Sequence, residues 1–271
     1  SIHFHAYETL NSIAITINDL HRGIKNHRIW LRLAKNDIRE RYQRSRIGPI
    51  WITLSMLIMV VTFGVLYGKL LGRDLSIHVP YVATGLAIWV FYSDVIIKSC
   101  NAFSSNSRII QQLPLPLSVF LYQLLAREMI VLAHHFILVA VIFLLLLHPE
   151  SFKILLLIPA FRVLTNNALS LGITFATIST RYRDVTDIFT ALIRPMMFIT
   201  PIIWSIDMVP ERAFYLVYNP IYYLIDIVRS PILGQSIKIE SWIFVTFFTA
   251  CVMLIAIIVY GRFRNRIIYW L

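Results

Sequence analysis

The sequence is poor in charged residues and almost free of cysteine, and each shortage narrows the possible classes of protein. Asp, Glu, Lys and Arg make up 14% of the chain, where a soluble domain carries about 25%. The two cysteines lie at the end of one apolar segment (Cys100) and inside another (Cys251). Neither a disulfide framework nor a metal site is therefore predicted, and the chain is too apolar for an ordinary soluble domain.

A glycine-rich loop that could bind nucleotide phosphates is also absent. The stretch GVLYGKL at residues 64–70 is one residue too short between its glycines, and Leu70 replaces the Ser or Thr that would contact Mg²⁺. Gly64, Gly68 and Gly72 instead recur every four residues within an apolar segment, as small residues do between closely packed membrane helices. The sequence therefore predicts no nucleotide site on this chain, and the glycines are interpreted as a packing surface or, alternatively, a hinge.

The chain does contain long apolar segments that are bounded by charged or turn-forming residues. A helix rising ~1.5 Å per residue needs about 20 apolar residues to cross ~30 Å of hydrocarbon, and in lipid its backbone groups must be paired internally. The sequence therefore predicts an all-α integral membrane protein with six transmembrane helices. The predicted spans are residues 50–71, 79–97, 129–147, 154–179, 188–204 and 242–260.

The net charge of +11 is distributed unevenly along the chain. Lys and Arg are concentrated before the first span, after the second and fourth spans, and in the C-terminal tail. Because Lys and Arg accumulate on the cytoplasmic side of a membrane, both termini are predicted to be cytoplasmic, and residues 1–26 form a cytoplasmic N-terminal segment. The basic residues flank spans and do not cover a soluble domain, so no nucleic-acid partner is predicted.

Residues 27–46 are predicted to form an amphipathic helix along the cytoplasmic interface. Its apolar arc and its basic stripe are separated at helical spacing. One interpretation is attraction to anionic membrane lipid. The other is a guide for a lipid substrate that carries phosphate, because arginines in a row suit bidentate contact with phosphate. The basic stripe consists of Arg28, Arg32, Lys35, Arg39 and Arg46.

Residues 101–113 are predicted to form a short helix on the cytoplasmic side. Polar residues at its start can cap it, and Pro114 and Pro116 end it. The helix is too short to fold alone and its apolar residues need a partner, so it is either a plain connector or a docking element for a cytoplasmic protein. The candidate docking residues are Asn106, Arg108, Ile109, Ile110 and Leu113.

Residues 205–241 separate the last two predicted spans and are too long for a loop without structure. The segment is apolar and rich in Tyr, and Pro210, Pro220 and Pro231 divide it into pieces too short to span. Irregular backbone at membrane depth must be covered by protein or line a wet cavity. We therefore expect re-entrant half-helices that form an outer gate. The candidate gate residues are Tyr215, Tyr218, Tyr222 and Tyr223.

Several of these segments together resemble one known family. RDVTDIFTALIRPMMFITPIIW (183–204), followed by MVPERAFYLVYNPIYYLIDIVRSPIL (208–233), is similar to the permease subunit of bacterial polysaccharide ABC exporters of the ABC-2 class. AKNDIRERYQRSRIGPIW (34–51) resembles that family's interface helix and first span, and SNSRIIQQLPLPLSVF (105–120) resembles its coupling region. The similarity covers nearly the whole chain, in the same order.

The resemblance implies a multi-pass protein of the bacterial inner membrane that exports a lipid-linked glycan. It implies a homodimer that works with two nucleotide-binding ATPase subunits. ATP and Mg²⁺ are then bound by those partners, and this chain is a transport subunit without enzymatic activity or a cofactor of its own. The implied cargo is an O-antigen-like polysaccharide linked to undecaprenyl pyrophosphate, and capsule or teichoic acid is the related possibility.

A passage for sugars needs flat apolar faces with polar edges, which Tyr and Trp provide. The alternative for such aromatics is the belt found at any membrane interface. The candidate passage residues are Trp51, Phe63, Tyr67, Phe198 and Trp204.

Two other functions remain open at the level of sequence. One is an ABC permease for a drug or a small lipid. The other is a membrane enzyme that acts on polyprenyl phosphates, which would present acidic metal-binding loops to the cytoplasm. Asp184 and Asp187 are the nearest such pair, and the neighbouring Arg181 and Arg183 favour an ordinary loop cluster.

Overall fold

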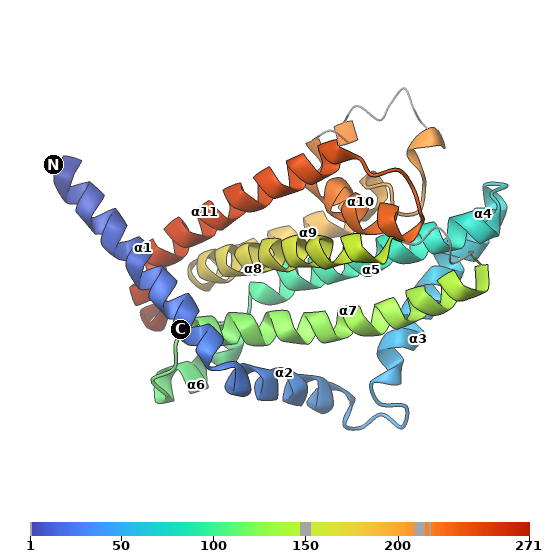
Figure 1. The fold of residues 1–271 in the computed structure, drawn as a ribbon. Helices are drawn as coiled ribbons and strands as arrows, with labels where there is room; N and C mark the ends of the chain where they lie inside the picture. Colours follow the sequence, from blue (N-terminus) through green and yellow to red (C-terminus); the bar gives the residue numbers. More distant parts are fainter. Residues whose placement is uncertain (1, 147–152, 209–214, 217) are drawn as a thin grey trace.

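The computed structural model describes residues 2–146, 153–208, 215–216 and 218–271, and the described part of the chain contains helices and no strand (Figure 1). The predicted all-α fold is confirmed. The α-helices are α1 (Ile2–Lys25), α2 (His27–Tyr42), α3 (Ile50–Val60), α4 (Tyr67–Leu70), α5 (Leu75–Ser99), α6 (Ser107–Gln112), α7 (Ser118–Leu146), α8 (Leu157–Arg181), α9 (Asp184–Ile199), α10 (Pro220–Ile232) and α11 (Ile239–Trp270). The short elements are a π-helical turn, η1 (Val61–Leu66), and the 3₁₀ turns η2 (Ser104–Asn106), η4 (Ile154–Leu156) and η5 (Ile206–Met208).

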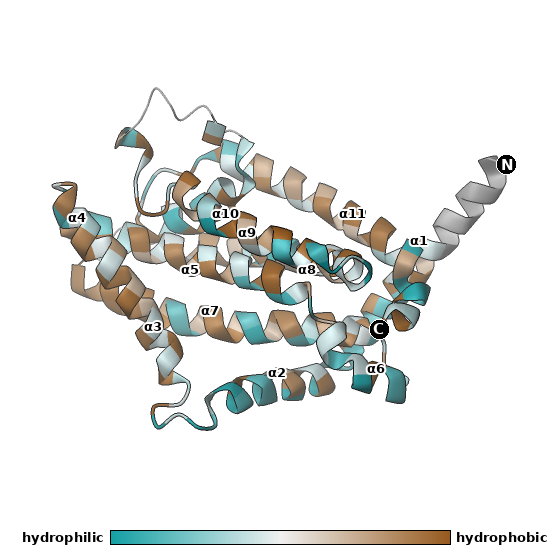
Figure 2. Ribbon diagram, turned by 180° about the vertical axis from the view of Figure 1, so that it is seen from behind, coloured by the Kyte–Doolittle hydropathy of each residue, from teal (hydrophilic) through white to brown (hydrophobic). Residues whose placement is uncertain are grey.

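By length and composition, four of the described helices can cross a membrane. Figure 2 shows that apolar residues dominate their surfaces, whereas α2 and α6 are largely hydrophilic. Two of the four extend ten residues or more beyond their predicted spans, because α7 begins at residue 118 instead of 129 and α11 continues to residue 270 instead of 260. These four helices are Ile50–Leu70, Leu75–Ser99, Ser118–Leu146 and Ile239–Trp270.

Helices α8 and α9 occupy the fourth and fifth predicted spans but are more polar. Arg162, Asn166 and Asn167 lie on α8, and Arg194 lies on α9. Helix α8 nevertheless packs along α5 and α11, two of the four apolar helices (Figure 1). The six-span count and the cytoplasmic placement of both termini therefore remain predictions.

Helix α5 is the centre of the bundle, and most of its residues are buried between α7, α8, α10 and η1. The Tyr92 hydroxyl donates a hydrogen bond to the Leu164 carbonyl of α8 at 3.1 Å. At the start of α5, a Cβ at Gly68 would lie 2.8 Å from Leu75 and 2.9 Å from His78. The glycine therefore allows the end of the first span to approach α5 closely, as the packing interpretation expects.

Helix α1 crosses the ends of α7 and α11 (Figure 1), and one buried carboxylate fixes it there. Asp19 is 2% exposed. It accepts hydrogen bonds from the Ser118 backbone N–H at 3.1 Å, the Tyr260 hydroxyl at 2.7 Å and the Arg264 guanidinium at 2.6 and 3.1 Å. Ser118 and Arg264 lie beyond the predicted spans of α7 and α11, so the extensions of both helices hold α1.

We expect Asp19→Ala to destabilise the protein strongly, because it removes the acceptor of two donors. These donors are the half-buried Arg264 guanidinium and the buried Tyr260 hydroxyl. The expected loss is about 3 kcal/mol, at the lower end of the range for breaking a buried ion pair because Arg264 keeps some access to water. Thermal unfolding of the purified protein in detergent measures this, with Glu240→Gln, an exposed carboxylate on α11, as the control. Equal melting temperatures for the two variants would contradict the prediction.

Candidate functional site

Helix α2 divides its residues between a packed face and a charged face. On the packed face, Ala34 and Ile38 are buried against the bundle, and the rings of Trp30 and Tyr122 of α7 lie 5.9 Å apart. The side chains of the basic stripe are exposed. The stripe is therefore free to contact anionic groups, and Arg28, Arg32, Lys35 and Arg39 share one side of the helix.

The end of α2 differs from the expected boundary. The helix ends at Tyr42, four residues before the predicted end at residue 46. The Ser45 hydroxyl accepts hydrogen bonds from the backbone N–H groups of Ile47 and Gly48, and Gly48 has a positive φ of 61°. Because this turn redirects the chain toward α3, Arg46 lies outside the helical stripe.

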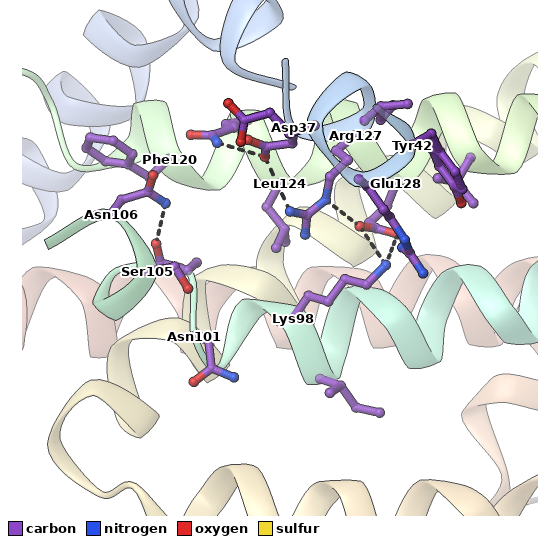
Figure 3. Close-up of a pocket in the computed structure, with 17 residues that line it drawn as sticks. Asp37, Tyr42, Lys98, Asn101, Ser105, Asn106, Phe120, Leu124, Arg127 and Glu128 are labelled. Carbon is purple, nitrogen blue, oxygen red and sulfur yellow. Dashed lines mark hydrogen bonds and ion pairs between the residues drawn. The ribbon is translucent and has the colours of Figure 1, made fainter. Parts of the chain in front are cut away.

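A cavity of about 570 Å³ lies behind α2, between that helix, the end of α5, η2 and α7 (Figure 3). Its upper wall carries Asp37 of α2, whose carboxylate accepts hydrogen bonds from Gln123 at 2.9 Å and Arg127 at 3.3 Å. Both partners lie on α7. Asp37 therefore joins the two helices directly above the cavity.

The network of charged residues that contains Asp37 and Arg127 continues to α5. Arg127 also contacts Glu128 at 2.8 Å, and Lys98 contacts Glu128 at 3.0 Å (Figure 3). Lys98 also contacts Asp94 of α5 at 2.8 Å. The Glu128 side chain is 1% exposed, so its two cationic partners compensate a charge that would otherwise be costly to bury. Of the cations that line this cavity, Lys98 and Arg127 are already paired with carboxylates and Arg41 lies over the Tyr42 ring at 5.7 Å. The exposed stripe of α2 therefore offers more cations to an anionic substrate.

The expected docking helix is shorter than residues 101–113 and buries one of its proposed contact residues. It consists of η2 and α6, which ends at Gln112. Ile110 is 8% exposed, and the Asn106 side chain is turned back to donate to the Ala102 carbonyl at 2.8 Å. Arg108 and Leu113 are exposed and Ile109 is half-buried, so these three residues form the available surface.

A groove of about 440 Å³ adjoins this surface. It runs between α6, the following segment that includes Pro114, and the end of α11 at Arg264 and Ile268. Leu113, which is 52% exposed, lies at the groove. The structure thus places an exposed apolar residue beside a cavity at the same end of the bundle as α1 and α2.

The aromatic residues proposed for the passage form two separate groups. In the first span, the rings of Phe63 and Tyr67 lie 5.8 Å apart. Trp51 is exposed and lies twelve residues before Phe63. At the end of α9, the Trp204 indole donates to the Phe198 carbonyl at 2.9 Å, and the Phe198 ring is exposed. No described ring contact joins the two groups within one chain.

The described part of residues 205–241, the proposed gate segment, contains one well-packed helix, α10. Asn219 caps it by accepting from the N–H groups of Ile221 and Tyr222. Tyr223 stacks on Phe244 of α11 with ring centroids 4.1 Å apart, and its ring contacts that of Tyr222 at 5.0 Å. By contrast, Tyr218 is 82% exposed.

Part of the proposed gate lies outside the described residues. Residues 209–214 and 217 lie outside the described residues, and Tyr215 belongs to a short described piece between them. The re-entrant arrangement therefore remains a prediction, with α10 as the helix that fits it.

Sequence reasoning missed the charged residues on the buried face of α10. Arg229 is 3% exposed. It donates to the Pro201 carbonyl at 2.9 Å and lies over the Tyr81 ring at 3.7 Å. A Cβ at Gly85 would lie only 2.0 Å from the guanidinium, so the absence of a side chain there makes room for Arg229. The sequence feature that could have identified Arg229 is an Arg within an apolar segment, where an ionised side chain is costly.

An ion pair joins the turn before α5 to η5. Arg73, in the turn before α5, contacts Asp207 of η5 at 2.9 Å. A hydrogen bond from Ser205 and the pair with Arg73 hold the pKa of Asp207 below its ordinary value. The carboxylate is therefore ionised throughout the neutral range, and the contact is lost only as the pH falls through that lowered pKa.

These features agree with one class of membrane protein. The chain belongs to the ABC-2 type transporter family, which matches residues 29–233. It is a multi-pass permease of the inner membrane, and permeases of this kind work with ATPase subunits.

Two curated relatives give the comparison more detail. Both are described as "O-antigen export system permease protein RfbA" from Klebsiella pneumoniae. The first is 22% identical over 239 residues, which cover 86% of this chain and 91% of the relative. The second is 21% identical over 238 residues with the same coverage.

Proposed function

We propose that this chain is the transmembrane subunit of an ATP-driven exporter that moves a lipid-linked polysaccharide out of the cytoplasm. The observation that carries the proposal is that α2 is packed on one face and exposes its basic stripe on the other. One face of this helix is fixed to α7 by apolar packing and by Asp37, so Arg28, Arg32, Lys35 and Arg39 remain exposed together. Four cations on one rigid helix suit a diphosphate headgroup, because charge-assisted contacts are roughly twice as strong as neutral ones.

The comparisons support the polysaccharide as cargo. The two relatives that share most of their length with this chain are named as O-antigen export permeases. We infer an O-antigen-like glycan on undecaprenyl pyrophosphate, carried by a homodimer of this chain. In this proposal the aromatic groups of the first span and of α9 come from different subunits and line one passage, and α10 with the outer Tyr residues forms its gate.

ATP hydrolysis is assigned to two partner subunits that dock at α6. The described region offers Arg108, Ile109 and Leu113 as a small mixed apolar and basic surface beside a groove. A partner side chain that enters this groove would also contact the end of α11. Movement of α6 would then reach the spans through both α7 and α11.

Vesicles that contain this chain and its ATPase partner test the function directly. We expect them to translocate an undecaprenyl-pyrophosphate-linked glycan only when ATP is supplied, as measured by exposure of the glycan to a membrane-impermeant glycosidase. Vesicles that contain this chain alone are the control. Translocation of a small lipid or a drug, with no movement of the glycan, would instead favour the alternative permease.

The docking surface predicts an effect of Leu113→Asp. A charge at this exposed apolar position should weaken binding of the ATPase by about tenfold or more while the permease still folds. Co-purification and titration of the partner measure this. Ile110→Ala is the comparison, because that buried residue should lower the melting temperature first. Unchanged partner affinity in Leu113→Asp would mean that the ATPase binds elsewhere.

Replacing Arg28, Arg32 and Arg39 together by Lys separates the two interpretations of the basic stripe. Attraction to a lipid surface depends on charge, at ~1 kcal/mol per residue, so a plain membrane anchor should tolerate this change. A guide for diphosphate should not, because Lys lacks the planar fork of Arg. We expect slower export at normal abundance and normal partner assembly. Export at the wild-type rate would make α2 a plain anchor.

A further inference from the structure

Helix α9 carries a polar stripe that the proposed function does not explain. Its members are exposed and recur three or four residues apart, which places them within an arc of about 80° on a helix of 3.6 residues per turn. The neighbouring exposed stripe, with Ile188, Leu192 and Ile199, is apolar. The two stripes therefore suit different environments. The polar members of this stripe, which we call the polar stripe, are Asp184, Asp187 and Arg194, and Ala191 and Phe198 lie on the same arc.

Arg194 is the critical member because of its depth. It lies ten residues after Asp184, or ~15 Å along the helix, and close to the centre of the predicted span at residues 188–204. Helix α9 is held at this level by its packing on α5 and by the contact between Phe189 and Phe175 of α8, whose ring centroids are 4.4 Å apart. A charged side chain near the middle of a bilayer is costly unless it faces water or an opposite charge.

The described part of the chain offers Arg194 no opposite charge. The Arg194 side chain is exposed, and among the described residues no ion pair or hydrogen bond engages it. Asp94 is the only acidic residue within the six predicted spans, and it is already paired with Lys98 at 2.8 Å. A second copy of the chain would therefore bring Asp94 to this depth only as part of its pair with Lys98. Arg162, the other span arginine, lies only five residues after α8 begins, close enough to an end to reach the interface.

We propose that Arg194 lies in the passage and contacts an anionic group of the moving cargo, a phosphate or a carboxylate. The guanidinium fork fits either group in a bidentate geometry. Ala191, one turn before it, leaves room beside the fork, and Phe198, one turn after it, offers a flat apolar face for a sugar. Arg194 thereby makes the passage selective for negatively charged cargo. This inference rests on the proposed function and identifies the chemical class of its substrate.

Thiol labelling tests the position of Arg194 without reference to transport. In a Cys100→Ala, Cys251→Ala background, Arg194→Cys and Leu192→Cys differ by two residues and belong to the polar and apolar stripes respectively. In the assembled complex, a small water-soluble methanethiosulfonate should modify the thiol of the Arg194→Cys variant at least about tenfold faster than that of the Leu192→Cys variant. Any smaller ratio would overturn the proposal, because position 194 would then be no wetter than the apolar stripe.

Export of two defined cargoes tests the anionic contact. Arg194→Gln and the matched control Leu192→Ala are compared in vesicles with an undecaprenyl-pyrophosphate-linked neutral glycan and with the same glycan bearing carboxylates. Loss of one charge-assisted contact should slow export by about tenfold. Slowing for both cargoes identifies the pyrophosphate as the contacted group, and slowing for the acidic glycan alone identifies its carboxylates.

Two results separate the failure of this inference from that of the proposed function. Export of both cargoes at the control rate by Arg194→Gln would overturn the anionic contact while leaving the exporter intact. If the wild type exports neither glycan, the proposed polysaccharide function is wrong, and the labelling ratio still reports whether Arg194 faces water. Abundance and ATPase binding of each variant are measured alongside. Both should stay normal, because the exposed Arg194 side chain forms no ion pair or hydrogen bond with the described residues.

Discussion

A charge that is buried in a protein or a bilayer has to be paired or kept in contact with water, and this constraint organises most of the polar structure of the chain. Glu128 is buried between Lys98 and Arg127, Asp19 is enclosed by donors from two other helices, and Arg229 is shared between a carbonyl and an aromatic ring. Each arrangement joins elements that are distant in sequence. The charges thus specify which helices meet, while apolar packing supplies the area that is buried.

Much of the fold follows from hydropathy alone, because the cost of an unpaired backbone in lipid forces long apolar segments into helices. The first, second, third and last predicted spans each lie along an apolar helix. Hydropathy could not give the extensions of α7 and α11 beyond their predicted spans, since charged residues interrupt the apolar runs there and the extensions are stabilised by packing against α1 and α2. It also gave no sign that residues 2–25 form a helix, because α1 depends on tertiary contacts centred on Asp19.

The candidate site was predictable where a single helix carries the pattern. The basic stripe of α2 could be found from spacing, because its members are exposed on one side of one element. Ile110 could not be assigned in this way, since an apolar residue on a short helix has the same appearance in sequence whether it faces a partner or its own bundle. The Asp37–Arg127 contact and the Arg229 environment join separate elements, and spacing within one helix carries no information about such pairs.

The Asp19 cluster also sets an order for biogenesis. Its carboxylate is bonded to Tyr260, a separation of 241 residues along the chain. At synthesis rates of about 5–20 residues per second, roughly 10–50 s pass between the emergence of α1 and that of its partner on α11. During this interval Asp19 of α1 lacks Tyr260 and Arg264, and α11 has to be synthesised before α1 can make its full set of contacts. Closure of this contact therefore reports that α11 is in place, and a permease truncated before α11 would hold α1 loosely and leave it open to proteolysis.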